Sequence, residues 1–181
     1  MRREIALAFL SAACVAAAPA PKPPAGPNLG QTPSAADIAA ADISPSPDGL
    51  SLPAGSGSPA QGAAIYAAKC QVCHGAAGAG GPNARLTGGI GTLDTPRPVK
   101  TVASFWPRAT TVFDYIRRAM PIDAPQSLTN SQTYALTAYI LSVDGIVGPD
   151  AVLDARSLPR VTMPNARAAV SSEPRLRRPK P

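Results

Sequence analysis

The residues best suited to chemistry in this sequence are two cysteines and a histidine, in the stretch AAKCQVCHGA. Two residues separate Cys70 from Cys73, and His74 follows directly. This spacing suits three kinds of site: a covalently attached haem, a structural zinc ion, or a redox-active pair of thiols. The cysteine and histidine content of the whole chain separates these possibilities.

The zinc and dithiol interpretations leave part of the pattern unexplained. A structural zinc ion takes four ligands, but the chain has one histidine, and its third cysteine, Cys14, lies in a segment that resembles an export signal. A thioredoxin-type dithiol needs a strand followed by a helix and has no use for His74. In haem attachment both thiols bond to the vinyl groups, and the histidine becomes an axial ligand of the iron. The motif therefore predicts one haem c, attached through Cys70 and Cys73 and ligated by His74.

A methionine is the expected second axial ligand, because its soft sulfur stabilises ferrous iron and favours the high potential of an electron carrier. Met1 leaves with the export signal, and Met163 lies beyond the last expected helix, where an apolar contact suits it better. Met120 ends an expected helix, and Pro121 turns the chain there. We predict His74 and Met120 as the axial ligands, with Met163 or an open sixth position as alternatives, and no catalytic residue.

Residues 1–20 resemble a signal peptide. Arg2 and Arg3 precede the apolar run IALAFLSAACVAAA, which is too short to span a membrane comfortably. The mature protein is therefore expected outside the cytoplasm, in a bacterial periplasm. Alternatively, Cys14 is the acylated cysteine of a lipoprotein, since LSAAC loosely resembles a lipobox, and only then do we expect attachment to a membrane.

The composition indicates that a packed core occupies only part of the 181 residues, since prolines number 22 and aromatic residues make up 4%. Residues 21–57 form a Pro- and Gly-rich leader, which is either a flexible linker or lies on the domain or a partner. The folded domain is expected over 58–145, a wrapping extension over 146–166 and a basic disordered tail over 167–181. The net charge is +6, but no nucleic-acid motif accompanies it, so we expect no nucleic-acid partner.

Helical patterns predict an all-α domain. Ser34 can cap a short helix in the leader, Ser58 is a good N-cap for the helix that carries the cysteines, and Thr110 or Thr111 can cap the next. The glycine-rich run between positions 75 and 91 suits a loop that passes close to a flat cofactor. Apolar periodicity places the helices over 59–73, 110–119 and 129–142.

With these residues in hand, the chain resembles a class I cytochrome c, in which an N-terminal helix carrying the haem motif crosses a C-terminal helix. Gly62 and Tyr66 resemble the glycine and aromatic residue of that crossing, and Leu136 and Tyr139 resemble their partners. The small Gly62 would let the two backbones approach closely.

A narrower resemblance is to the SoxD-type cytochrome subunits of periplasmic sulfane and sulfite dehydrogenases. The segments that carry it include PVKTVASFWPRATTVFDYIRRAMP and VTMPNA, within roughly residues 30–166. The resemblance implies a monohaem subunit that accepts electrons from a molybdopterin subunit oxidising a sulfur compound, then passes them to a downstream acceptor. It implies no substrate chemistry of the chain's own, and it implies His74 and Met120 as axial ligands.

One departure from the family pattern concerns the carbonyl that orients the ligand histidine. These cytochromes usually place a proline two residues before the leucine under the haem, but here Ala84 lies two before Leu86, and the nearest proline is Pro82. An acceptor for the imidazole N–H is still expected, because that bond tunes the ligand. The sequence leaves open which carbonyl supplies it.

Two other functions compete with this interpretation: a free electron shuttle to an oxidase, and a haem enzyme or gas sensor with an open sixth position. The leader and extension favour a docked subunit, and Met120 disfavours the enzyme or sensor. The surface around Cys70 and Cys73 is expected to be small and apolar, as an electron-transfer contact requires. We expect a basic rim around it, drawn from Lys69, Arg85, Lys100 and Arg117 or Arg118, although one of the last two could instead pair with a haem propionate.

Overall fold

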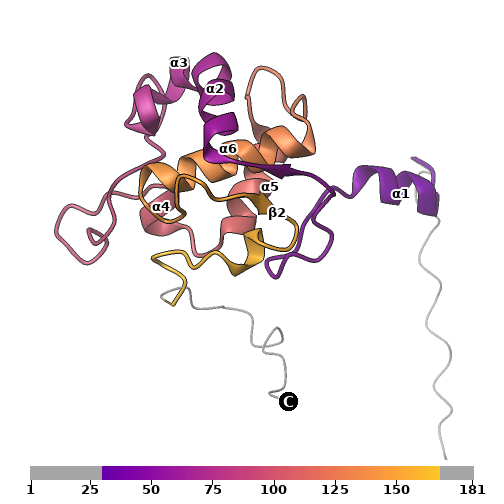
Figure 1. Cartoon of the computed structure of the whole chain (residues 1–181). Coiled ribbons are helices and arrows are strands. Elements are labelled where there is room, and N and C mark those ends of the chain that lie inside the picture. The colour runs from indigo at the N-terminus through magenta and orange to yellow at the C-terminus, as the bar shows by residue number, and fades with distance from the viewer. Residues whose placement is uncertain (1–29, 168–181) are drawn as a thin grey trace, which may run out of the picture.

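Six α-helices provide most of the regular structure between residues 30 and 167, the part of the chain that the computed structural model describes (Figure 1). Two short strands and two 3-10 turns complete it. The expected signal peptide and residues 168–181 of the expected tail lie outside this range. The elements in chain order are α1 (Ala35–Ala41), β1 (Ser56–Gly57), α2 (Pro59–Lys69), α3 (Gln71–His74), η1 (Ala76–Gly78), α4 (Val102–Phe105), α5 (Ala109–Ala119), α6 (Asn130–Val143), β2 (Leu153–Asp154) and η2 (Leu158–Arg160).

The crossing of α2 and α6 organises the domain, as the resemblance to class I cytochromes c implies. A methyl group built on Gly62 would overlap the Ala135 carbonyl and would lie 2.7 Å from Tyr139 Cβ, so only glycine permits this approach of the two helices. The rings of Tyr66 and Tyr139 meet beside it with centroids 5.0 Å apart. Leu136 is buried on α6 but faces a cavity described below. The all-α prediction is confirmed, and the only sheet among the described residues is a pair of two-residue strands.

Two predicted helices differ in detail from the structure. The helix expected over 59–73 divides at Cys70 into α2 and α3, and α2 alone is capped by Ser58, whose hydroxyl accepts from Gln61 N. The prediction that Thr110 or Thr111 caps the next helix is wrong. The cap position of α5 is Arg108, which makes no side-chain bond there, and the Thr110 hydroxyl instead donates to the Pro47 carbonyl.

Residues after 145 belong to the core. Leu153, Leu158 and Met163 are all nearly inaccessible to solvent, at 3%, 0% and 1% exposure. Strand β2 pairs antiparallel with β1 in the register Ser56–Asp154, which ties the extension to the start of the domain. The packed core therefore continues beyond the 58–145 that apolar periodicity indicates. Between residues 30 and 167 no helix combines the length and apolarity needed to cross a membrane.

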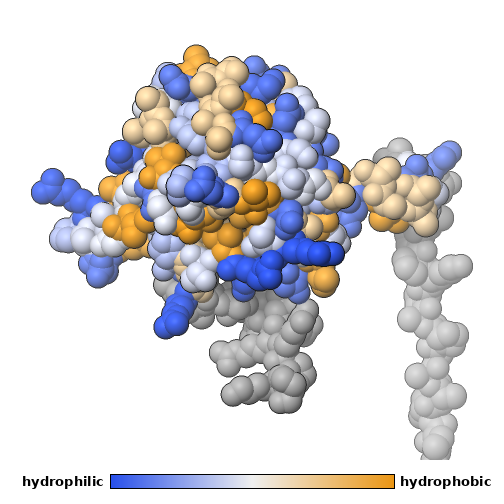
Figure 2. Space-filling view, in the orientation of Figure 1, coloured by the Kyte–Doolittle hydropathy of each residue, from blue (hydrophilic) through white to orange (hydrophobic). Residues whose placement is uncertain are grey.

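The described part of the leader consists of a helix followed by a segment of turns and loop. Helix α1 has no buried residue and stands to one side of the domain, with a largely apolar surface (Figures 1 and 2). A capping box between Ser34 and Asp37 satisfies its first turn, as expected for the short leader helix. We call residues 43–54, which follow α1 and run over α5 and α6, the strap.

Candidate functional site

The expected haem-binding residues surround one cavity of about 670 Å³. Cys70, Cys73 and His74 line it from α3 and the residue before it, and Met120 lines it from the end of α5. Most of the remaining wall is apolar and comes from four parts of the chain. These residues include Leu86, Val102, Val112, Ile116, Leu128, Leu136 and Ile140.

His74 is oriented by the backbone of the loop that follows it. Its Nδ1 lies 2.7 Å from the carbonyl oxygen of Ala84, so Nδ1 is the natural donor and Nε2 is the ring nitrogen left for a metal. Asn83 N donates to the Cys73 carbonyl at 2.9 Å, which holds the loop beside the motif. The carbonyl that the sequence left open is therefore that of Ala84, and no proline is needed at that position.

Tyr66 fixes the turn after the motif. Its hydroxyl donates to the Gly75 carbonyl at 2.9 Å, and desolvation by burial, followed by the nearby Cys70 and Tyr139, raises the pKa of Tyr66 to about 12. The hydroxyl therefore remains a donor throughout the physiological pH range. Gly75 has φ +77°, and a Cβ there would collide with the Gly80 carbonyl, so the turn depends on glycine.

Met120 and Met163 have different surroundings. Met120 is the C-cap of α5, in extended conformation with φ −118° and ψ 144°, as expected for a residue that precedes proline. It is partly buried and belongs to the cavity wall. Met163 is 1% exposed within the apolar core and does not line the cavity. This placement supports the assignment of Met120 as ligand and of Met163 as a packing residue.

Asp144 anchors the glycine-rich loop, a role that sequence reasoning missed. Both of its carboxylate oxygens accept from Gly88 N, at 2.8 and 2.9 Å, and Thr101 Oγ1 donates to the Gly88 carbonyl at 2.6 Å. An acidic residue at the C-terminal end of α6 is unfavourable for the helix dipole. The bond to the loop offsets that cost. In the sequence, the one sign of this role was an aspartate placed just after a helix, where its charge is unfavourable.

We expect Asp144→Ala to lower the free energy of unfolding by about 2 kcal/mol, because it leaves the part-buried Gly88 N–H without its acceptor. Asp144→Asn keeps one acceptor oxygen and removes the unfavourable charge, so its stability should stay near that of the wild type. Thermal unfolding of the haem-loaded protein measures both. Equal stability of the alanine variant and the wild type would show that the loop is held by other contacts.

The basic residues expected around the cavity divide into two groups. Lys69, Arg85 and Lys100 line it and are exposed, and we call these three the rim. Arg117 and Arg118 do not line it; their guanidinium groups donate to Ile43 O and Ser44 Oγ in the strap. Neither arginine therefore belongs to the rim, and neither is placed to pair with a haem propionate in this cavity.

Exposed apolar side chains border the same cavity. Val72, between the two cysteines, is 77% exposed, and Ile122, just after Met120, is 71% exposed. Phe105 lies beneath the Lys100 ammonium, 5.1 Å from its ring centroid. A small apolar surface next to three cations is the arrangement expected for a transient electron-transfer contact.

The residues of the cavity fit a covalently attached haem. Two thiols, one imidazole with its Nδ1 engaged and one thioether share a space whose other walls are mainly apolar, as a large flat macrocycle requires. Within residues 30–167 no three histidine, cysteine, aspartate or glutamate side chains converge as a metal site. The donor set is therefore that of an axially ligated haem iron rather than of a zinc ion.

Comparisons with known proteins agree with this chemistry. The family model described as cytochrome c matches residues 59–144. Among solved structures, the chain is similar to the sulfane dehydrogenase SoxCD from Paracoccus pantotrophus, at 40% sequence identity and a TM-score of 0.74. That match covers 82% of this chain and 73% of the other, and so extends well outside the residues of the family model. A search of curated proteins found no match.

Proposed function

The chain belongs to the cytochrome c family, whose members carry covalent haem c, and on that premise we propose that it is the electron-accepting subunit of a molybdenum-dependent enzyme that oxidises a sulfur compound, either sulfane sulfur or sulfite. Its relationship to the sulfane dehydrogenase is the observation that carries this proposal. The shared region exceeds the haem domain, and the leader and extension suit a docked subunit. A free shuttle needs neither segment.

Within this function, each side chain of the cavity has one role. Cys70 and Cys73 would hold the haem through thioether bonds, and His74 and Met120 would ligate its iron. When bound, the haem would supply one-electron chemistry between the partner and a downstream acceptor. Ala84 O keeps the His74 imidazole in one tautomer, Tyr66 holds the turn behind it, and the apolar walls exclude water. No residue of the chain carries out substrate chemistry.

The alternative of another class, a haem enzyme or gas sensor, needs an open sixth position and a polar distal group. Met120 lies in the cavity wall, and the chain's one histidine is already part of the attachment motif. Absorption spectra separate the two functions: a weak far-red band of the oxidised protein reports methionine ligation, and carbon monoxide binding by the reduced protein reports an open site. A missing far-red band together with rapid carbon monoxide binding would favour the enzyme or sensor.

Cytochromes c of bacteria typically work in the periplasm, and we place this chain there through the signal at residues 1–20. Acylation at Cys14 would add a membrane anchor. Mass spectrometry of the mature protein identifies its first residue and any lipid on that cysteine. An intact N-terminus on cytoplasmic protein would contradict export.

Co-purification tests the partnership directly. The tagged, haem-loaded protein should retain a molybdopterin-containing subunit from its own periplasm, and this complex should reduce the haem when thiosulfate-derived sulfane sulfur or sulfite is added. The cytochrome alone should not be reduced by either compound. Reduction of the isolated cytochrome, or transfer from an unrelated dehydrogenase with equal rate, would argue for a free shuttle.

The rim should govern the rate of docking. We expect Lys69→Glu to slow electron uptake from the partner by about tenfold at low salt and less at high salt, because rim charges mainly steer association. The haem potential should remain almost unchanged. Arg156→Glu, an equal change of charge at an exposed position outside the cavity, is the control. If the rate of electron uptake changed with neither the salt concentration nor Lys69→Glu, the docking surface would lie elsewhere.

A further inference from the structure

Helix α5 presents two opposite faces. Val112, Ile116 and Met120 recur at helical spacing and line the haem cavity. Thr110 and Arg117 occupy the other side, together with Asp114 and Arg118. At 100° per residue the centres of these two groups lie roughly 145° apart. Whatever contacts the second face therefore acts on the helix from behind the cavity.

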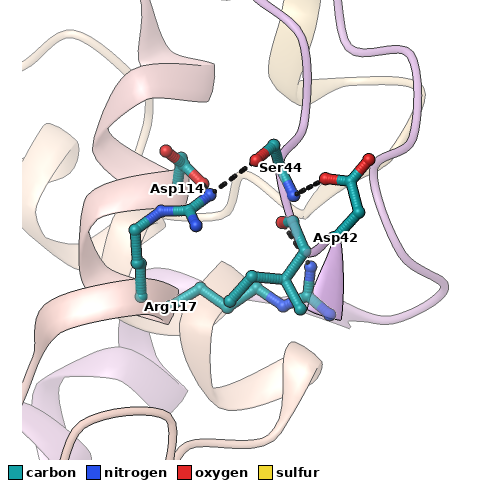
Figure 3. Close-up of polar contacts among 6 residues, drawn as sticks. Asp42, Ser44, Asp114 and Arg117 are labelled. Carbon is teal, nitrogen blue, oxygen red and sulfur yellow. Dashed lines mark hydrogen bonds and ion pairs between the residues drawn. The ribbon is translucent and has the colours of Figure 1, made fainter. Parts of the chain in front are cut away.

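The strap occupies this second face (Figure 3). Arg117 Nη1 donates to the Ile43 carbonyl at 2.9 Å, and Arg118 Nη2 donates to Ser44 Oγ at 3.0 Å. The backbone of Ser44 is in turn held by the Asp42 carboxylate, at 3.1 Å. One turn of α5 immediately before Met120 is thus bonded twice to a segment from the leader.

The contacts continue along the full length of α5 and onto α6. Thr110 Oγ1, in the first turn of α5, donates to the Pro47 carbonyl at 3.0 Å. Tyr134 Oη and Asn130 Nδ2 on α6 then donate to the carbonyls of Pro53 and Ala54, at 2.9 and 3.2 Å. After the strap, the chain continues into β1 and then into α2, the helix that leads to Cys70. One segment therefore bonds to both α5 and α6, two of the helices that line the cavity.

Helix α5 has few other restraints at its ends. Its N-cap makes no side-chain hydrogen bond, and its C-terminal end shows only the bond from Met120 N to the Ile116 carbonyl. No glycine follows to form a C-cap, because the next residues are Met120 and Pro121. The final carbonyls of a helix lack intrahelical donors, so capping contributes little to holding this turn. Arg117 and Arg118 connect this turn to the strap.

We propose that the strap, through Arg117, is a positioning element for Met120: it holds the last turn of α5 against the haem cavity and so keeps the thioether at the sixth position. The inference rests on the proposed role of Met120 as axial ligand. Arg117 contributes more than Arg118, because its bond is to a fixed backbone carbonyl, whereas Arg118 shares its guanidinium with the half-buried Asp114 carboxylate at 2.7 Å. The leader is then part of the electron-transfer site, although none of its residues lines the cavity.

The test compares Arg117→Met with Arg117→Lys in the full-length, haem-loaded protein. Methionine keeps the apolar stem and removes the donors, while lysine retains one donor for Ile43 O. Loss of one hydrogen bond from a charged group shifts a two-state equilibrium by about tenfold. The fraction of reduced protein that binds carbon monoxide should therefore rise about tenfold in Arg117→Met, with a weaker far-red band and a lower potential. Arg117→Lys should recover most of the wild-type behaviour.

Arg108→Met is the matched control, because it removes the same charge from the other end of α5, where the side chain makes no hydrogen bond among the described residues. Its spectrum and carbon monoxide binding should equal those of the wild type. Thermal unfolding, recorded for all variants, separates a general loss of stability from a change confined to the sixth position. A destabilised Arg117→Met with wild-type band, potential and carbon monoxide binding would overturn the inference.

Met120→Ala distinguishes failure of this inference from failure of the proposed ligation. If Met120→Ala abolishes the far-red band and Arg117→Met leaves it unchanged, Met120 is the ligand and the strap does not position it. If Met120→Ala itself leaves the band unchanged, the ligand assignment is wrong. Support for the inference requires loss of the band in Met120→Ala, weakening in Arg117→Met, and recovery in Arg117→Lys.

Discussion

Met120→Ala is expected to keep its covalent haem while losing the far-red band, binding carbon monoxide in the reduced state and falling in potential. The thioether sulfur stabilises ferrous iron, so its removal disfavours reduction and opens the sixth position. Cys70, Cys73 and the bond from His74 to Ala84 O are untouched by this change. Denaturing electrophoresis with haem staining confirms attachment, and redox titration together with carbon monoxide binding measures the two other effects.

Met163→Ala is the control. It should lower the stability of the fold and leave the ligation of the haem unchanged. Removing a core methionine that is 1% exposed leaves a cavity and costs about 2–5 kcal/mol of stability. The far-red band and the potential should not change, because Met163 does not line the haem cavity. If Met163→Ala lost the band and Met120→Ala kept it, the assignment of the two methionines would have to be exchanged.

Gly62→Ala should be strongly destabilising, although alanine favours helix by about 1 kcal/mol over glycine. The added methyl group would overlap the Ala135 carbonyl, and a backbone atom at a helix crossing has little freedom to move away. We expect a loss of about 3 kcal/mol, near the upper end for overpacking, and a Tm lower by about 10 °C. Thermal unfolding followed by circular dichroism gives both values.

Gly148→Ala serves as the comparison because a Cβ built there meets nothing within 4 Å and the residue has no positive φ. This substitution should be neutral or stabilise the protein by about 0.5 kcal/mol, since alanine reduces the freedom of the unfolded chain. A loss of stability in Gly62→Ala together with a gain in Gly148→Ala would support the close crossing of α2 and α6. A fully stable Gly62→Ala protein would mean that the helices lie farther apart.

Local signals allowed much of this fold to be predicted from the sequence. Ser58 begins α2 as expected, and the last helix begins after Thr129, within a residue of its predicted start. Both caps bond to the backbone three residues ahead, a pattern that is complete within one turn of helix. The haem motif is equally local, which is why the cofactor could be predicted from three residues.

The features that the sequence did not reveal depend on distant or backbone groups. Any residue can offer a carbonyl, so nothing about Ala84 marked it as the partner of His74. Strands β1 and β2 have two residues each and show no alternation of apolar and polar residues. Asp144 and Arg117 looked like ordinary charges near helix ends, and only the fold brings their partners, Gly88 and Ile43, beside them.

The strap also implies an order of assembly. Arg117 and Ile43 are 74 positions apart in the chain, and Tyr134 and Pro53 are 81 positions apart. Closing such long loops costs entropy before their contacts form, so these bonds come late in folding. The attachment motif, by contrast, is contiguous and needs no folded neighbour. Haem attachment can therefore precede folding. In that order, the new chain would already carry its covalently bound cofactor while the Met120 side of the cavity was still unassembled and accessible to outside ligands.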